Sequence, residues 1–220
     1  MQRLISFGCS LTYGHGLPDC FIPPFDPGLN PSKLAWPSVV AAKLGKTCIN
    51  MSDPGASNKR IWNSIINYKF KQDDIVFILW SYVDRSAIIN RMQVKDIGTW
   101  INNDRSMAYY KHIHSDFDAL LQTKLFVSHA DFFLKEKGIK VYHLVAERNL
   151  AKIFKLGSIT VSHVPLYIWN NYRCYHPTAL DNSHPGIDCH IEFGEDVVKY
   201  ITTGTVTHRS ILEKIKCKLI

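Results

Sequence analysis

Five short apolar segments, each bounded by turn residues, constrain the fold of this chain more than any other feature. They are RLISF (3–7), TCIN (47–50), DIVFILW (74–80), IKVYHLV (139–145) and SITVSH (158–163). Runs of this length that are rich in Ile and Val and lack apolar–polar alternation are typical of strands buried on both faces of a sheet. We therefore expect a core built around a parallel sheet.

The segments between these strands have helical periodicity. Helices are expected over 34–45 and 57–70, from Ser115 to Gly138, and after Pro185. Strands that alternate with helices predict a parallel sheet covered on both faces, and right-handed crossovers make a doubly wound sandwich the default topology. Functional sites in such sheets lie beyond the carboxyl ends of the strands.

The length and net charge of the chain limit the number of domains and the kinds of partner to be expected. With 220 residues, 46% of them hydrophobic, the chain suits a single domain over 1–220. Within it, the stretch 91–115 is the least regular and is a candidate lid. Lys and Arg number 26 against 19 Asp and Glu, and the resulting charge of +7 permits weak attraction of anionic partners or substrates. The densest basic stretch, ILEKIKCKLI (211–220), has the spacing of a solvated helix face, so no nucleic-acid partner is expected.

No segment indicates export or membrane insertion. The first residues run into the first predicted strand without the apolar region of a signal peptide, and no run approaches the roughly 20 apolar residues of a membrane span. The six cysteines lack a CxxC pair and zinc-type spacing, so reduced thiols are expected. These features predict a cytoplasmic protein without a membrane span, and they leave its oligomeric state open.

The segment FGCSLTYGHGL places Ser10 where the first strand opens into a turn. A nucleophile, a phosphate-binding loop or an ordinary polar turn can each occupy such a position. The segment does not match the GxSxG elbow of α/β-hydrolases, because Leu11 and Thr12 follow the serine. LGKT, which resembles the end of a P-loop, has Val40 where that motif requires glycine. Cys9 is a rival nucleophile beside the serine.

A second segment, DNSHPGIDCH, holds Asp181 and His184 three residues apart in a turn. One tight segment can thus place a carboxylate against an imidazole, the pair that activates a serine nucleophile. Alternatively, the aspartate only caps the following helix and the histidine is exposed. HIH (112–114), Asp188 and His190 add groups that can bind metals. No metal is expected, because the last two residues are more easily explained as surface positions on the final helix.

Four motifs occur in a fixed order: GCS (8–10), WP (36–37), DPGASN (53–58) and DNSHP (181–185). This order resembles that of the SGNH, or GDSL-like, hydrolase family over about residues 4 to 200. In that family the first-motif serine is the nucleophile, and the late Asp and His complete a catalytic triad. The resemblance therefore implies these roles for Ser10, Asp181 and His184. It also implies an oxyanion hole formed by the backbone N–H groups of Gly55 and Ser10.

The third block of the family pattern is where this sequence departs from it. The family usually carries an Asn after the third strand, in a pattern like GxND, whereas this chain has LWSYVDR without an Asn. A hydroxyl from Ser81 or Tyr82, or the amide of Asn58, could replace the missing donor. Loss of one oxyanion donor typically lowers the rate about 10²- to 10³-fold, so the departure concerns efficiency more than reaction type. Asp84 and Arg85 are expected to form an ion pair at the strand end.

The residues and the resemblance together predict a three-layer α/β/α sandwich with a flavodoxin-like, five-stranded parallel sheet. The implied activity is that of a serine esterase that needs no cofactor. Its substrate would be a small-molecule or carbohydrate ester, such as an acetyl ester on a carbohydrate or a lipid-like ester, cleaved through an acyl-enzyme. Two alternatives remain open: an O-acyltransferase with the same triad, and a non-catalytic ligand- or carbohydrate-binding module on the same fold.

Overall fold

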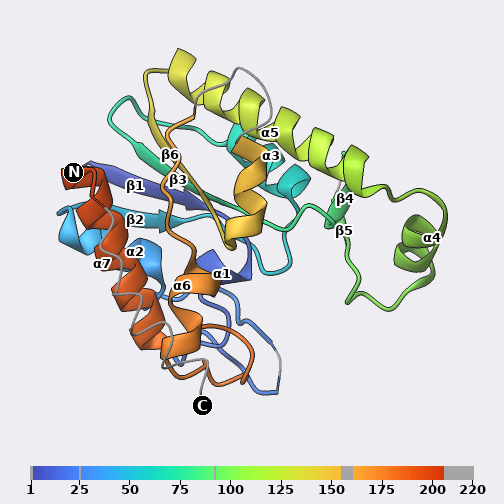
Figure 1. Ribbon diagram of the computed structural model, residues 1–220, viewed down its shortest axis with the longest axis horizontal. Helices are drawn as coiled ribbons and strands as arrows, with labels where there is room; N and C mark the ends of the chain where they lie inside the picture. Colours follow the sequence, from blue (N-terminus) through green and yellow to red (C-terminus); the bar gives the residue numbers. More distant parts are fainter. Residues whose placement is uncertain (1, 25, 92, 155–160, 206–220) are drawn as a thin grey trace.

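A four-stranded parallel sheet forms the centre of the chain (Figure 1). Its strands β1 (Arg3–Phe7), β2 (Thr47–Asn50), β3 (Ile75–Trp80) and β6 (Lys140–Val145) lie in the order β2-β1-β3-β6. Every neighbouring pair is parallel, as the apolar segments predicted. The computed structural model describes residues 2–24, 26–91, 93–154 and 161–205.

The predicted fifth strand at 158–163 is wrong for the part of it that the structure describes. There the chain only passes beside β6 in an isolated bridge. The N–H of His143 donates to the carbonyl of Ser162, and the N–H of Val164 donates back to the carbonyl of His143, both at 2.9 Å. Beyond this bridge the N–H of Leu166 donates to the carbonyl of Val164 at 2.9 Å rather than to β6, so the pairing ends there. The described sheet therefore has four strands and one bridge at its β6 edge.

Helices cover both faces of this sheet, which confirms the predicted three layers (Figure 1). On one side α2 (Trp36–Lys43) packs against α7 (Ile187–Thr203), and on the other α3 (Asn58–Asn67) packs against α5 (Asp116–Glu136). These are the four helices that the sequence periodicity predicted. The buried side chains of β1 and β3 fill the core between the two helical layers.

A hairpin and a helix occupy much of the stretch that the sequence marked as irregular. β4 (Ser86–Ile89) pairs antiparallel with β5 (Val94–Ile97), and α4 (Asp104–His112) follows. Arg60 on α3 binds Asp96 on β5, which ties the hairpin to the central layers. Shorter elements are α1 (Ser10–Tyr13), α6 (Ile168–Asn171) and the 3-10 helices Arg148–Phe154 and Arg173–Tyr175.

Within the described ranges, none of the helices combines the length and the apolar composition needed to cross a bilayer. Cys9, Cys20 and Cys48 form no disulfide with any described residue, and their redox state stays a prediction. The basic stretch at 211–220, expected to be a solvated helix face, lies outside the described residues.

A buried histidine joins β6 to its two neighbours, β3 and α5. His143 is fully buried, and its Nδ1 accepts the indole N–H of Trp80 at 3.0 Å. Its Nε2 lies 3.2 Å from Oδ1 of Asp131. This pattern places the single ring proton on Nε2, and burial lowers the pKa of His143. The neutral ring therefore serves as both acceptor and donor in the core.

We expect His143→Ala to lower the free energy of unfolding by about 3 kcal/mol, because it removes a packed ring and leaves two buried polar groups without partners. His129→Ala is the matched control: His129 also accepts an indole N–H, from Trp62 at 2.9 Å, but it is exposed. Its loss should change the unfolding free energy by less than about 1 kcal/mol. Urea unfolding of both variants measures the difference, and equal effects would contradict a stabilising role for the buried network.

Candidate active site

Ser10 lies where β1 gives way to α1, directly beyond the carboxyl end of the strand. Gly8 permits this turn, because a Cβ there would lie 2.2 Å from Oγ1 of Thr12 and 3.2 Å from the carbonyl oxygen of Leu79. Ser10 is only 7% exposed. Its backbone N–H, at the helix start, donates to no hydrogen bond among the described residues.

The loop that follows β2 lies against the same turn. The N–H of Asp53 donates to the carbonyl of Gly8 at 3.2 Å, which ties the loop to the end of β1. Gly55 has a φ of +76°, in the left-handed region that favours glycine. Within the described part of the chain, its N–H also has no hydrogen-bond partner. Gly55 and Ser10 thus each present an unengaged backbone donor.

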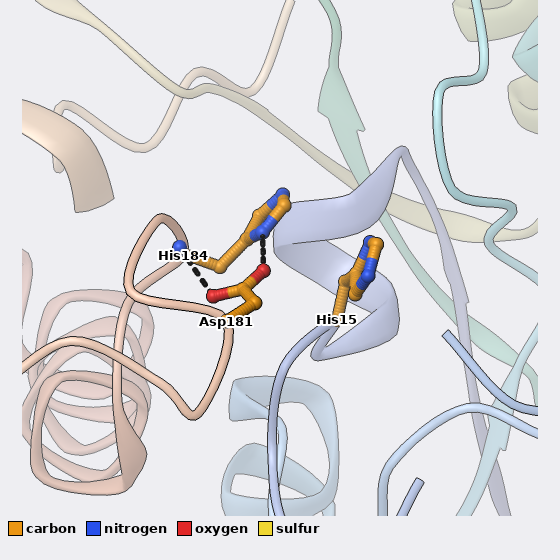
Figure 2. A group of neighbouring side chains, drawn as sticks. All are labelled: His15, Asp181 and His184. Atoms are coloured by element: carbon orange, nitrogen blue, oxygen red, sulfur yellow. Dashed lines mark hydrogen bonds and ion pairs between the residues drawn. The ribbon is translucent and has the colours of Figure 1, made fainter. Parts of the chain in front are cut away.

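The late motif folds as the carboxylate–imidazole turn that its spacing predicted (Figure 2). Oδ2 of Asp181 lies 2.5 Å from Nδ1 of His184, and Oδ1 accepts the N–H groups of Ser183 and His184, both at 3.0 Å. Burial opposes the ionisation of Asp181, but these hydrogen bonds outweigh it and hold its pKa below the usual range. The carboxylate is therefore ionised and orients the imidazole with Nε2 directed away from it.

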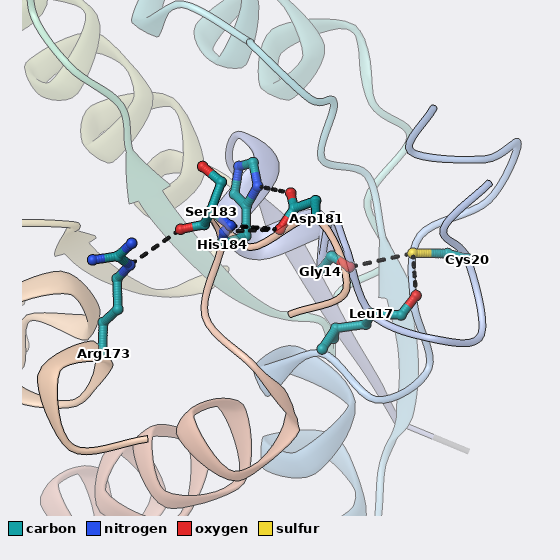
Figure 3. Close-up of polar contacts among 7 residues, drawn as sticks. All are labelled: Gly14, Leu17, Cys20, Arg173, Asp181, Ser183 and His184. Carbon is teal, nitrogen blue, oxygen red and sulfur yellow. Dashed lines mark hydrogen bonds and ion pairs between the residues drawn. The ribbon is translucent and has the colours of Figure 1, made fainter. Parts of the chain in front are cut away.

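Two further contacts hold this turn in place. Nε of Arg173 donates to the carbonyl of Ser183 at 3.1 Å (Figure 3). The guanidinium carbon of Arg173 also lies 4.3 Å from the ring centre of Trp169. On the other side, the N–H of Leu180 donates to the carbonyl of Gly16 at 3.0 Å. The segment after α1 and the Asp–His turn are therefore fixed to one another.

These three segments meet at one pocket of about 430 Å³, which Ser10, Gly55 and His184 line together. Side chains from residues 80–100 and from α6 complete its wall. Among the described residues, no hydrogen bond joins Oγ of Ser10 to His184. Hydrogen bonds between a nucleophile and its base are often long without substrate and tighten when it binds. The structure thus brings together the serine, the Asp–His pair and two backbone donors that the sequence singled out.

Solved structures of ester hydrolases share this architecture. An acetyl xylan esterase from the rumen bacterium Butyrivibrio proteoclasticus matches with a TM-score of 0.60 at 13% identity, over 92% of this chain and 64% of that one. A carbohydrate acetylesterase from Sinorhizobium meliloti matches with a TM-score of 0.54 at 13% identity, over 93% and 100% of the two chains. A member of the lipolytic G-D-S-L family from Veillonella parvula gives 0.50 at 10% identity, over 92% and 100%. The chain has the fold of the SGNH hydrolases.

The similarity to these proteins is one of structure. No protein-family profile matches the sequence, and no curated protein matches it either. The chain spans about two-thirds of the acetyl xylan esterase, 64% of its length. The structural matches show that this chain has the SGNH fold, but at identities of 10–13% they do not assign its substrate.

A histidine that sequence reasoning missed stacks on His184 in this pocket. The ring centres of His15 and His184 lie 4.6 Å apart, with 20° between the ring planes (Figure 2). With Asp181 they form a group whose potential metal-ligating atoms lie within 4.8 Å of one another. Ring lone pairs lie in the ring plane, so stacked imidazoles do not aim them at one point, and Oδ2 of Asp181 already accepts from His184. The geometry suits an oriented base better than a metal centre.

Two of the other candidate metal ligands, His190 and His114, have local structural partners. Nδ1 of His190 accepts the backbone N–H of Trp36 at 3.2 Å, at the start of α2. The sequence had suggested a surface position for His190, but the residue is fully buried. Burial lowers the pKa of His190 to about 3. Asp188 is exposed on the first turn of α7, and His114 lies 2.9 Å from Asp116.

Asn58 and Ser81 were expected to supply a third oxyanion donor, but the side chain of Asn58 binds the backbone of Ser81 instead. Nδ2 of Asn58 donates to the carbonyl of Ser81 at 3.0 Å and to Oγ1 of Thr123 at 3.2 Å, while its Oδ1 accepts the N–H of Ser81 at 2.6 Å. Both residues are buried, and neither lines the pocket of Ser10. The geometry therefore argues against Asn58 as the donor, and it gives Ser81 no direct access to the pocket.

In this arrangement Asn58 has a structural role. We expect Asn58→Ala to lower the free energy of unfolding by about 2 kcal/mol, because it leaves the buried N–H and carbonyl of Ser81 without partners. Ser64→Ala, on the part-exposed side of the same helix, provides a control for helix effects. Urea unfolding and kcat, measured well below the melting temperature, separate the two roles. A fall in kcat of about 10²-fold or more with unchanged stability would restore Asn58 to the oxyanion hole.

The third-block segment reaches the pocket through other side chains. Tyr82 lines it, but its hydroxyl donates to Oε1 of Glu147 at 3.0 Å and is therefore engaged. Arg85 also lines it and forms no ion pair with Asp84 among the described residues, so that predicted pair is wrong. Trp100, from the candidate lid stretch, covers Gly55: a Cβ on that glycine would lie 3.3 Å from the indole ring. Whether the stretch opens and closes as a lid stays a prediction.

Proposed function

We propose that the chain is a serine ester hydrolase of the SGNH type, in which Ser10, His184 and Asp181 form the triad. The observation that carries this proposal is the single pocket lined by Ser10 and by the imidazole that Asp181 orients. The unengaged N–H groups of Ser10 and Gly55 support it, because acyl transfer requires donors for a developing oxyanion. Structural neighbours described as an acetyl xylan esterase and a carbohydrate acetylesterase support the reaction class.

The proposed reaction proceeds in two halves. Nε2 of His184 takes the proton of Ser10 as Oγ attacks the ester carbonyl, and the oxyanion is held by the backbone N–H groups of Ser10 and Gly55. The tetrahedral intermediate collapses, and the alcohol leaves with the proton from His184. Water, deprotonated by His184, then attacks the acyl-enzyme, and the acid leaves while Oγ of Ser10 regains its proton. Every role in this scheme is filled by the chain's own residues.

The pocket supports a small acyl group and an alcohol that packs against aromatic rings. Its volume of about 430 Å³ is in the range of small-ligand sites, and Tyr82, Trp100 and Trp169 lie in its wall. Aromatic faces of this kind suit sugar rings and aryl alcohols alike. Because two structural neighbours are described as an acetyl xylan esterase and a carbohydrate acetylesterase, we place acetyl esters of carbohydrates first among candidate substrates and use short aryl esters as reporters.

Assaying acetate release from aryl acetates and from acetylated sugars tests the proposal. Hydrolysis above the uncatalysed rate supports it, and formation of a new ester when an acceptor sugar is added would assign the chain to the acyltransferases instead. Absence of both reactions, together with binding of the intact ester, would contradict the proposal and favour the non-catalytic module.

A further inference from the structure

A single arginine enters the pocket between two aromatic rings. The guanidinium carbon of Arg85 lies 4.4 Å from the ring centre of Trp100 and 4.8 Å from that of Tyr82. Its Nη1 donates to Oγ of Ser81 at 3.2 Å. Cation–π contact with two rings and one hydrogen bond fix the position of the planar group. The orientation of Arg85 is thus determined by the protein before any ligand binds.

Arg85 forms no ion pair among the described residues, although its charge acts through space on Asp96. The pocket wall contains no Asp or Glu among the described residues. The neighbouring carboxylates are engaged elsewhere, because Asp96 is bound by Arg60 and Glu147 accepts the hydroxyl of Tyr82. A buried or half-buried cation without a counter-charge is costly unless a ligand supplies one. Among the described residues, the only hydrogen bond that the guanidinium donates goes to Ser81, which leaves N–H groups for a ligand.

We infer that Arg85 makes the pocket selective for esters that carry a second, anionic group, a carboxylate or a phosphate. This inference rests on the proposed function, since it names the substrate class of the same site. The guanidinium binds such groups through paired, charge-assisted hydrogen bonds, which are about twice as strong as neutral ones. Ser10 and Arg85 line the same pocket, so one small ester can reach both. The net charge of +7 further favours anionic substrates over neutral ones.

Three matched esters test the selectivity: the acetates of meta-hydroxybenzoate, meta-hydroxybenzamide and meta-hydroxyphenyl phosphate. They share the ring and the scissile bond and differ in charge, and the two anionic members separate carboxylate from phosphate recognition. For wild type, kcat/KM should be about 10-fold or more higher for an anionic ester than for the amide. In Arg85→Gln this ratio should fall about 10- to 100-fold, mainly through KM, because the charged hydrogen bonds form in the bound substrate as well as in the transition state.

Arg148→Gln is the matched control, because Arg148 also lies over an aromatic ring, that of Tyr167, but does not line the pocket. Its ratio should stay within about twofold of wild type. An unchanged ratio in Arg85→Gln would overturn the inference. An equal fall in both variants would also overturn it, because the effect would then reflect net charge alone.

Calorimetric binding separates this inference from the proposed function. meta-Hydroxybenzoate should bind wild type at least about 10-fold more tightly than meta-hydroxybenzamide, and Arg85→Gln should remove the difference. This measurement needs no turnover. If no ester is hydrolysed but the Arg85-dependent difference persists, the proposed function fails and the anion site stands. If wild type binds the two compounds equally, the inference fails whatever the enzyme hydrolyses.

Discussion

Replacing Ser10 by alanine should lower kcat for an aryl acetate by at least about 10³-fold, because it removes the hydroxyl that we propose forms the acyl-enzyme. The helix start and the Gly8 turn do not depend on the hydroxyl, so the melting temperature should change by only a few degrees. Steady-state kinetics with a thermal unfolding curve measures both quantities.

Ser6→Ala is the control for this variant. Ser6 is a fully buried serine on β1, the strand that leads to Ser10, and its side chain does not line the pocket. Its kcat should stay within a fewfold of wild type. If Ser10→Ala kept near wild-type turnover, the nucleophile would have to be another group, and Cys9 would be the first to examine.

Asp181→Asn should lower kcat about 10³- to 10⁴-fold while the protein stays folded. The amide can donate a proton toward Nδ1 of His184, which favours the tautomer with the proton on Nε2 and removes the base that Ser10 requires. The pKa of Asp181 is lower in the folded protein than in the unfolded chain, so ionised Asp181 stabilises the fold. This stabilisation is complete above the unfolded-state pKa and is lost as the pH falls through the folded-state pKa. In Asp181→Asn, the free energy of unfolding should no longer fall with pH through this carboxyl group.

Asp188→Asn provides the matched control. Asp188 lies on the first turn of α7, close in sequence, but it is exposed and does not line the pocket. Its kcat should remain within a fewfold of wild type. Comparable losses in the two variants would show that the segment tolerates no change of charge, and would remove the argument for Asp181 as the orienting group.

The parallel sheet and the Asp–His turn could be predicted because their causes are local. Non-alternating apolar runs require burial on both faces, and a spacing of three in a tight turn places a carboxylate against an imidazole. The hairpin of β4 and β5 was missed because its strands are four residues each and carry polar residues such as Lys95 and Asp96.

The spacing between Gly55 and Asn58 in the sequence could not decide whether Asn58 donates to the oxyanion hole. The side chain starts one helical turn beyond Gly55, but its amide is drawn to Ser81 and to Thr123, a residue 65 positions later on α5. Such a contact depends on how two helices pack, which a single segment does not encode. Arg85 was mispredicted for the same reason, since its position depends on Trp100 from a stretch without a clear pattern.

Trapping the acyl-enzyme tests the central claim most directly. The wild-type protein is mixed with an aryl acetate, quenched in acid within the first turnover, and examined by intact mass and peptide mapping. The account predicts an added acetyl group on Ser10 that appears before steady state, is lost on further incubation, and does not form in Ser10→Ala. An acetyl group on Cys9 or His15, or turnover without any covalent adduct, would contradict it.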